Sequence, residues 1–294
     1  MFEPERTLKK MRLRAFAKIN VGLHVVGRRP DGYHDIETIF HQINLSDELE
    51  MVQSEEGDVF TSDSPELASG SSNLCLRAVH ILRDLTGVHT GVEINLKKRI
   101  PIAAGLGGGS ADAAAVLKGL TRLWTLDITD EELKTVSATL GSDVPFFLTG
   151  GTAYATGRGE RLEPLDVSIP YWILVVTPLL HVSTTWAYTS LKIVRDARRV
   201  NLPDLLRKNI SHPDVLREKL CNEFEPLVFA AHPEVRHIKE GLLKAGAQVA
   251  LMSGSGSSIF SFFSDRAPAQ SIAKDFSSRY HTSITQPRFK PEPI

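Results

Sequence analysis

Residues 101–115 have the composition of an anion-binding loop. A proline opens the stretch, four glycines fill residues 105–109, and alanines follow Ser110. Residues 111–120 favour a helix, and the alternating residues 91–97 before the loop predict a strand. The first turn of a helix has unpaired N–H groups with partial positive charge, and glycines let a phosphate approach the backbone. The stretch therefore predicts a phosphate site, with Ser110 as the expected N-cap.

Two common phosphate loops are excluded by what the chain lacks. No Gly-Lys-Ser/Thr follows the glycines, as a Walker A loop requires. No Val-Ala-Ile-Lys or His-Arg-Asp set accompanies them, as in protein kinases. A flexible turn before an alanine-rich packing helix is the alternative interpretation of the same residues.

Two charged residues outside the loop could act on a substrate hydroxyl. Lys18 and Asn20 are two residues apart in an alternating stretch, so a strand places both on one face. A solvated strand face is the alternative, although the flanking residues are mostly apolar. Asp143 precedes Val-Pro and two phenylalanines at an expected turn. It is a candidate general base, or else a turn aspartate hydrogen-bonded to its own backbone.

The composition is that of a soluble globular protein. The 294 residues are 42% hydrophobic and 23% charged, with a formal net charge of −1. The absence of a basic bias argues against a nucleic-acid partner. No apolar run approaches the roughly 20 residues of a membrane helix, and residues 1–14 do not resemble a signal peptide. Two cysteines imply no disulfide framework, so we expect a cytoplasmic protein without a membrane partner.

The remaining elements are predicted from periodicity and capping residues. In the first half we expect a strand pair or one long bent strand at 13–26, a strand at 33–40, a surface loop at 54–72, a helix at 73–82 capped by Asn73, and a capped helix from Thr129 to about 139. In the second half we expect a buried strand at 171–176, loop and helices at 190–220, a helix at 234–245, a Gly/Ser loop entering a strand at 250–263, and a last helix, short strand and Pro-rich tail at 266–294. A Pro-bounded connector at 163–170 predicts two domains, residues 1–165 and 166–294.

Several motifs together resemble the GHMP kinases, which include galactokinase, homoserine kinase and mevalonate kinase. The loop has the family's Pro, three residues, Gly-Leu-Gly, small residues and alanines. Residues 17–20 are similar to the family's opening motif, residues 141–147 to its aspartate motif, and residues 253–258 to its third motif. The resemblance extends from about residue 14 to 263. It is strongest to the branch that acts on a cytidyl diphosphate alcohol in isoprenoid biosynthesis.

The resemblance implies an α+β protein with the two-domain GHMP kinase fold. The N-terminal domain would be ribosomal-S5-like, the C-terminal domain ferredoxin-like, and the site would lie between them. The implied activity is phosphoryl transfer from ATP, with Mg²⁺, to the tertiary hydroxyl of a cytidyl diphosphate substrate. Asp143 would accept the hydroxyl proton, and Lys18 would be its electrostatic partner. Mg²⁺ would be held mainly by phosphate oxygens, so no protein metal site is expected.

The resemblance also assigns residues to each ligand. The nucleotide set is Pro101, Ile102, Ala103, Ala104, Gly105, Leu106, Gly107, Gly108, Gly109, Ser110 and Ala111, with Lys98 and, near the adenine, Asn73 beside Leu74. The substrate set is Asn20, Tyr33, His34, Thr184, Tyr188, Gly254 and Ser255. Tyr33 and Tyr188 would form opposite walls for cytosine, and His34 would contact its polar edge. A hydrogen-bonded turn residue is the alternative for His34, and a packing aromatic is the alternative for Tyr188.

Two other functions stay open at this point. The chain could be a GHMP kinase for another small alcohol, such as homoserine or mevalonate. It could also be a non-catalytic nucleotide-binding homologue, although the presence of both Lys18 and Asp143 speaks against that. Residues 222–225 approximate a further family motif, with Glu223 in place of Asp, and are given no catalytic role.

Overall fold

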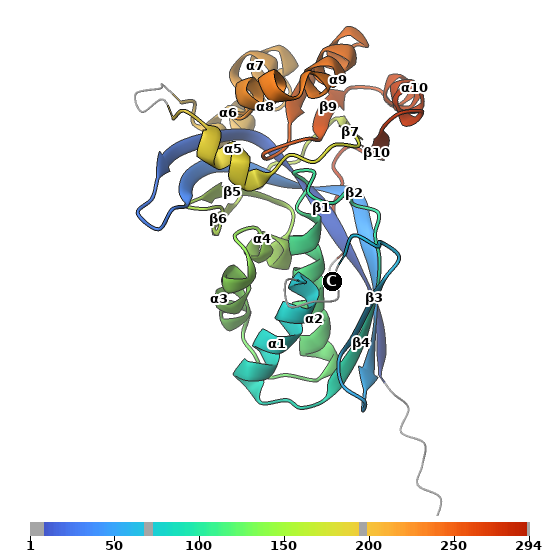
Figure 1. Cartoon of the computed structure of the whole chain (residues 1–294). Helices are drawn as coiled ribbons and strands as arrows, with labels where there is room; N and C mark the ends of the chain where they lie inside the picture. The colour runs from blue at the N-terminus through green and yellow to red at the C-terminus, as the bar shows by residue number, and fades with distance from the viewer. Residues whose placement is uncertain (1–8, 68–72, 194–198, 293–294) are drawn as a thin grey trace, which may run out of the picture.

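Two β-sheets, each packed against helices, make up the fold (Figure 1). The structure, a computed structural model, describes residues 9–67, 73–193 and 199–292. The first sheet has the order β3-β4-β2-β5-β6, with β1 paired to β2. Its strands are β1 (Lys10–Arg28), β2 (His34–Ser54), β3 (Val59–Ser62), β4 (Gly91–Lys97), β5 (Thr152–Thr156) and β6 (Arg161–Pro164). β3 and β4 pair in parallel, and the other pairs are antiparallel.

The hairpin of β1 and β2 spans the molecule (Figure 1). The two strands contain 19 and 21 residues, so the first predicted strand is one long strand and the second continues well beyond residue 40. Three register shifts bend the pair, and two of them lie between Phe16 and Lys18 and between Asn20 and Leu23. The prediction that Lys18 and Asn20 share a face is confirmed, because their side chains are hydrogen-bonded.

Four helices cover one face of this sheet (Figure 1). They are α1 (Leu74–Thr86), α2 (Gly108–Leu123), α3 (Asp130–Leu140) and α4 (Val144–Thr149). Asn73 caps α1 and Thr129 forms a capping box with Glu132, as predicted. The prediction of Ser110 as an N-cap is wrong. Gly107 is the N-cap of α2, because its φ of 71° turns the chain into the helix three residues before Ser110.

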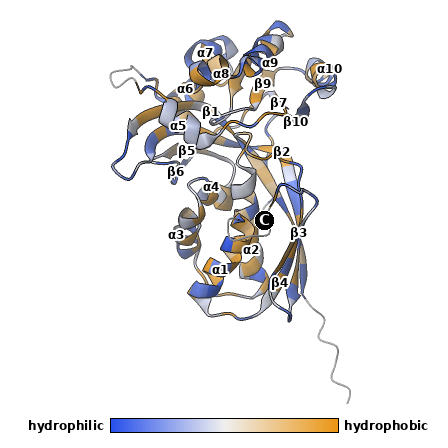
Figure 2. Cartoon of the chain, in the orientation of Figure 1, coloured by the Kyte–Doolittle hydropathy of each residue, from blue (hydrophilic) through white to orange (hydrophobic). Residues whose placement is uncertain are grey.

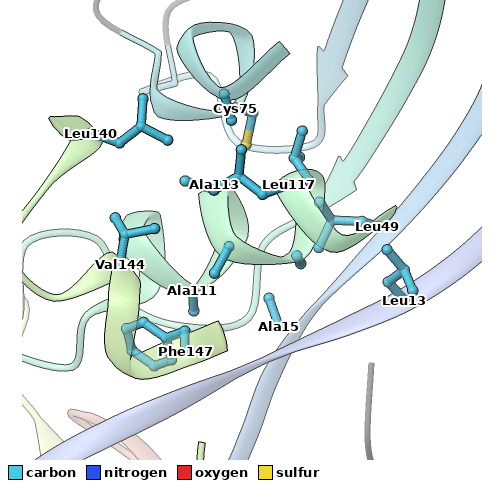
Figure 3. Close-up of a cluster of buried hydrophobic side chains, with 14 of the residues drawn as sticks. Leu13, Ala15, Leu49, Cys75, Ala111, Ala113, Leu117, Leu140, Val144 and Phe147 are labelled. Carbon is cyan, nitrogen blue, oxygen red and sulfur yellow. The ribbon is translucent and has the colours of Figure 1, made fainter. Parts of the chain in front are cut away.

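The alanines of α2 let the helix pack closely on its neighbours. Figure 3 shows Ala111 and Ala113 inside a cluster that includes Leu13 of β1 and Leu49 of β2, and Cys75 of α1 lies in the same cluster. The apolar residues of α2 accordingly lie in the interior between the sheet and the other helices (Figure 2). Small side chains bring the start of the helix, and with it the glycine loop, close to β1.

The second sheet has the connectivity and order of a ferredoxin-like domain, which confirms the predicted fold class. Its order is β10-β7-β9-β8, with all pairs antiparallel. Its strands are β7 (Trp172–Thr177), β8 (Val249–Met252), β9 (Ile259–Phe263) and β10 (His281–Thr285). Its helices are α5 (Thr184–Ser190), α6 (Leu202–Asn209), α7 (Pro213–Lys219), α8 (Glu225–Ala231), α9 (Pro233–Lys244) and α10 (Arg266–Ser277).

The prediction of a surface loop at residues 54–72 is wrong in part, because these residues include the strand β3. This strand lies at the edge of the sheet and has only four residues with alternating exposure. Four residues are too few for an alternating pattern to be distinguished from a loop in the sequence. Residues 68–72 of that prediction, and residues 1–8 of the N-terminal domain, lie outside the described residues. In the part of the chain that the structure describes, no helix is both long and apolar enough to span a bilayer.

The two sheets are joined by a common hydrophobic core. The predicted boundary between residues 165 and 166 falls between the last strand of the first sheet and the first strand of the second. One buried cluster nevertheless combines Ile19 and Ile43 of the first sheet with Leu206 of α6 and Phe260 of β9. Packing across this junction positions the β1–β2 hairpin against the second sheet.

His41 of β2 is buried close to this junction. Its exposed fraction is 4%, and its Nδ1 lies 2.8 Å from the Thr152 hydroxyl. Burial lowers the pKa of His41 from 6.5 to about 4, because a charged imidazole would lose its hydration. The unfolded chain therefore binds a proton at this histidine at a higher pH than the folded chain does.

We predict that His41 contributes to acid instability. As the pH falls from 6.5 through 4, the unfolded state gains a proton first, so the free energy of unfolding should decrease by about 3 kcal/mol from this group. His41→Asn should flatten that decrease in denaturant titrations between pH 7.5 and 4. The exposed His237→Asn is the control, and an equal effect of both variants would contradict the prediction.

Candidate active site

A cavity of about 770 Å³ gathers nearly all of the predicted site residues. All but three of them line it, and the exceptions are Asn73, Leu106 and Ala111. Leu106 and Ala111 are each 1% exposed with side chains in the core, and Asn73 accepts hydrogen bonds from the backbone of α1. A role of these three at the nucleotide therefore stays a prediction, and for Leu106 and Ala111 it rests on backbone groups.

The glycine loop is shaped by close backbone contacts. Gly105 has a φ of 79° and Gly107 a φ of 71°, values that favour glycine. A Cβ on Gly105 would lie 2.1 Å from the carbonyl oxygen of Ser253, and one on Gly107 would lie 2.8 Å from the ring of Phe147. The Leu106 carbonyl accepts a 3.0 Å hydrogen bond from the backbone N–H of Lys18. The loop is thus fixed to β1 while the N-terminus of α2 faces the cavity.

Lys18 of β1 is a buried cation beside the glycine loop. It is 4% exposed, and its Nζ donates to Asn20 Oδ1 at 2.6 Å and to the Gly105 carbonyl at 3.2 Å. Asp143 Oδ2 lies 3.5 Å from the same ammonium, and the Phe40 ring centroid lies 5.0 Å away. Burial lowers the pKa of Lys18, and the charge of Asp143 partly opposes that shift. The ammonium therefore points at a carboxylate on the cavity wall.

Asp143 is available for chemistry because its side chain has no capping role. It occupies the N-cap position of α4, but its carboxylate makes no cap hydrogen bond. Its side chain is 29% exposed and lines the cavity. The interpretation as a turn aspartate bonded to its own backbone is therefore wrong.

Lys98 lines the cavity but is held by two buried carboxylates. Its Nζ lies 2.5 Å from Asp47 Oδ2 and 2.9 Å from Asp112 Oδ2. Burial raises the pKa of Asp112, and the charge of Lys98 opposes that shift. Within the described residues Asp112 Oδ1 has no hydrogen-bond partner. Lys98 therefore ties the end of β4 to β2 and α2, and a direct contact with a nucleotide stays a prediction.

The far end of the cavity is aromatic. The rings of His34 and Tyr188 lie 5.1 Å apart, and Tyr188 packs edge-on against Phe224 at 4.8 Å. Tyr33 is 55% exposed, and the guanidinium of Arg158 lies 4.9 Å from its ring. Among the cavity-lining rings, the one in contact with Tyr188 is thus that of His34. Burial lowers the pKa of His34, and the charge of Arg28 lowers it further, so the imidazole is neutral near pH 7.

Several cavity residues were not predicted as site residues from the sequence. They are Leu23, Asp31, Gly32, Ile36, Phe40, Leu67, Ser142, Arg158, Thr185 and Thr189. The glycines on both sides of Arg158 were a usable signal, since they mark a tight turn that exposes one charged side chain. Leu67 and Phe40 carried no such signal, because only the folding of the chain brings them to the cavity.

Comparison with known proteins identifies the class to which this fold and site belong. The family model described as "GHMP kinases N terminal domain" matches residues 73–151, and "GHMP kinases C terminal" matches residues 202–282. The chain belongs to the GHMP kinase family and is an ATP-dependent small-molecule kinase.

The chain is similar to particular members of that family. Proteins named 4-diphosphocytidyl-2-C-methyl-D-erythritol kinase from Prosthecochloris aestuarii and Chlorobium phaeobacteroides are 41% and 43% identical to it. Each alignment covers 96% of this chain and 99% of the relative. A crystal structure of 4-(cytidine 5'-diphospho)-2C-methyl-D-erythritol kinase has a TM-score of 0.84 at 34% identity, over 95% of this chain and 100% of that one. A homoserine kinase from Cytophaga hutchinsonii has a TM-score of 0.72 at 18% identity, over 99% of both chains, which shows the shared fold alone.

We predict that Gly105→Ala damages both stability and activity. The new Cβ would collide with backbone at Ser253 and would hold a left-handed φ, so the free energy of unfolding should decrease by more than about 1 kcal/mol. The displaced loop should lower kcat/KM for ATP by at least about tenfold. Thermal unfolding and steady-state kinetics measure both effects.

Gly109→Ala is the matched control for stability. Its Cβ would make an ordinary 3.6 Å contact with Leu74 Cδ1 in a helical turn, so the variant should have a melting temperature equal to or above that of the wild type. Equal melting temperatures for the two variants would contradict the importance of the Gly105 contact.

Proposed function

We propose that this protein phosphorylates the 2-position tertiary hydroxyl of 4-diphosphocytidyl-2-C-methyl-D-erythritol with ATP, in the non-mevalonate isoprenoid precursor pathway. One observation carries the proposal: one cavity is lined by the glycine loop, by a Lys18–Asp143 pair 3.5 Å apart, and by an aromatic end. The names of the relatives and of the similar crystal structure support the same substrate.

The glycine loop would bind the phosphates of ATP. The first residues of α2, Gly108 to Ser110, line the cavity, and the free N–H groups and partial positive charge of a helix start favour an anion there. Mg²⁺ prefers oxygen ligands and keeps several waters, so the phosphate oxygens of ATP, with the Ser110 hydroxyl on the cavity wall, would fit it. When bound, Mg²⁺ would neutralise phosphate charge.

Asp143 and Lys18 would act on the acceptor hydroxyl. The Asp143 carboxylate is the general base that takes the hydroxyl proton. The Lys18 ammonium orients that hydroxyl, places an opposite charge 3.5 Å from the Asp143 carboxylate, and stabilises negative charge on the transferred phosphoryl group. Positioning and electrostatics supply most of the catalysis in phosphoryl transfer, so two such groups suffice.

The aromatic end of the cavity would bind the cytosine. Tyr188 offers a ring face, and the neutral His34 has one donor and one acceptor nitrogen for the polar edge of the base. Tyr33 provides a second ring, and the Arg158 guanidinium lies 4.9 Å from its centroid. A simple alcohol such as homoserine or mevalonate has no group that requires these rings, which disfavours the alternative substrates.

We predict turnover with the cytidyl substrate and its loss in Asp143→Ala. ADP release should be measured with 4-diphosphocytidyl-2-C-methyl-D-erythritol, homoserine and mevalonate. Asp143→Ala and Asp143→Asn should each lose about 10³-fold in kcat and stay folded, because this side chain caps nothing.

Asp265→Asn is the matched control, since Asp265 is an exposed N-cap whose side chain also makes no cap hydrogen bond. Wild-type turnover in the Asp143 variants would remove Asp143 from the mechanism. Activity on homoserine or mevalonate alone would replace the substrate, and nucleotide binding without turnover on any alcohol would favour a non-catalytic homologue.

We predict that Tyr188→Ala impairs the cytidyl substrate selectively. Loss of a stacking ring should raise KM for that substrate by about 10- to 100-fold and leave KM for ATP nearly unchanged. Tyr188→Phe keeps the ring and should resemble the wild type. Equal increases in both KM values would indicate a packing role for Tyr188 instead.

A further inference from the structure

Ser253 is a buried residue that contacts two other segments of the site without lining the cavity. It follows β8 at the start of the loop at residues 253–258 and is 0% exposed. Its hydroxyl donates to the Gly105 carbonyl at 2.9 Å and accepts from the backbone N–H of Asn20 at 3.2 Å. One side chain, 148 residues from Gly105 and 233 residues from Asn20 in sequence, therefore connects the glycine loop to β1.

Both contacts of Ser253 end on residues that hold Lys18. The Gly105 carbonyl also accepts from Lys18 Nζ at 3.2 Å, and Asn20 Oδ1 accepts from the same ammonium at 2.6 Å. These two acceptors, together with Asp143, determine the direction of the ammonium. A shift of Gly105 or of the Asn20 backbone would change the position of the charge relative to Asp143.

Asn222 holds the two residues on either side of Ser253 in the chain. This buried asparagine donates from Nδ2 to the carbonyls of Met252 and Gly254, at 2.7 and 2.8 Å, so it fixes the peptides that flank Ser253. Its own Oδ1 accepts from the Phe224 N–H. Asn222 also bridges to Leu23 of β1, so its position is set by the same strand that carries Lys18.

We propose that Ser253, held in place by Asn222, is a positioning residue for phosphoryl transfer that aligns the Lys18 ammonium with Asp143. The proposal rests on the proposed function of that pair. It also assigns a structural role to the motif at residues 222–225. Glu225 accepts a hydrogen bond from the Met252 N–H, so it fixes the chain directly before Ser253. Neither Ser253 nor Asn222 is among the cavity-lining residues.

Ser253→Ala is the direct test. The variant removes the donor to Gly105 and the acceptor for Asn20, so kcat should fall by about 10- to 100-fold with KM for ATP within about threefold of the wild type. Lys18 should also lose well-placed acceptors, which favour its charged form, so the alkaline limb of the kcat–pH profile should move to lower pH. Asp143 is the charged group that faces this ammonium, and its effect is present in both proteins.

Ser261→Ala is the matched control. Ser261 is equally buried, and its hydroxyl also donates to a backbone carbonyl, that of Leu174, but within the second sheet. It should lose a similar amount of stability and keep the wild-type kcat and pH profile. If Ser253→Ala keeps kcat within about twofold of Ser261→Ala, or leaves the alkaline limb unmoved, the positioning role is overturned.

A double-mutant cycle tests the part played by Asn222. Asn222→Ala should reproduce the kcat loss of Ser253→Ala, and the double variant should lose less than the product of the two single losses. Independent, multiplicative losses would overturn the coupling, and if Asn222→Ala does not fold, Ser253→Ala alone decides the proposal. If the wild type phosphorylates another alcohol and not the cytidyl substrate, the proposed substrate is wrong. The kcat of Ser253→Ala is then measured with that alcohol, and the positioning role is judged from it.

Discussion

A lysine ammonium that is taken out of water needs oxygen acceptors and a counter-charge around it. Lys18 obtains them from three separate segments: Asn20 on its own strand, the Gly105 carbonyl of the glycine loop, and Asp143 before α4. The bends of the β1–β2 hairpin and the alanines of α2 serve this arrangement, because they bring the loop against β1. The low-dielectric surroundings that lower the pKa of Lys18 also strengthen its interaction with any phosphate nearby.

The parts of the site that depend on local sequence could be predicted. The two-residue spacing of Lys18 and Asn20, the glycine run and the caps at Asn73 and Thr129 each act within a few residues, and the structure has them as expected. The N-cap of α2 was misplaced because serine is a good cap in general, whereas here the left-handed φ of Gly107 starts the helix. β3 was missed because four residues at a sheet edge give too short a pattern.

The contacts that could not be predicted join residues far apart in the chain. Lys98 was placed at the nucleotide by resemblance, but its two partners come from β2 and α2, and only the folded sheet brings them together. Tyr188 of α5 contacts the ring of His34, the first residue of β2, and this contact joins two segments far apart in the chain. No periodicity in the sequence predicts such long-range contacts, because they depend on the order of the strands in the sheets and on the path of each connection.

The hydrophobic core that spans both sheets restricts how the cavity can open. Rotating one half of the chain away from the other would separate Ile19 and Ile43 from Leu206 and Phe260, and would expose this buried surface at a cost of about 25 cal/mol for each Å². A clamshell hinge, as in binding proteins that close around a ligand, is therefore disfavoured. Ligand entry and product release should instead depend on small movements at the rim, which leaves the geometry around Lys18 intact from one turnover to the next.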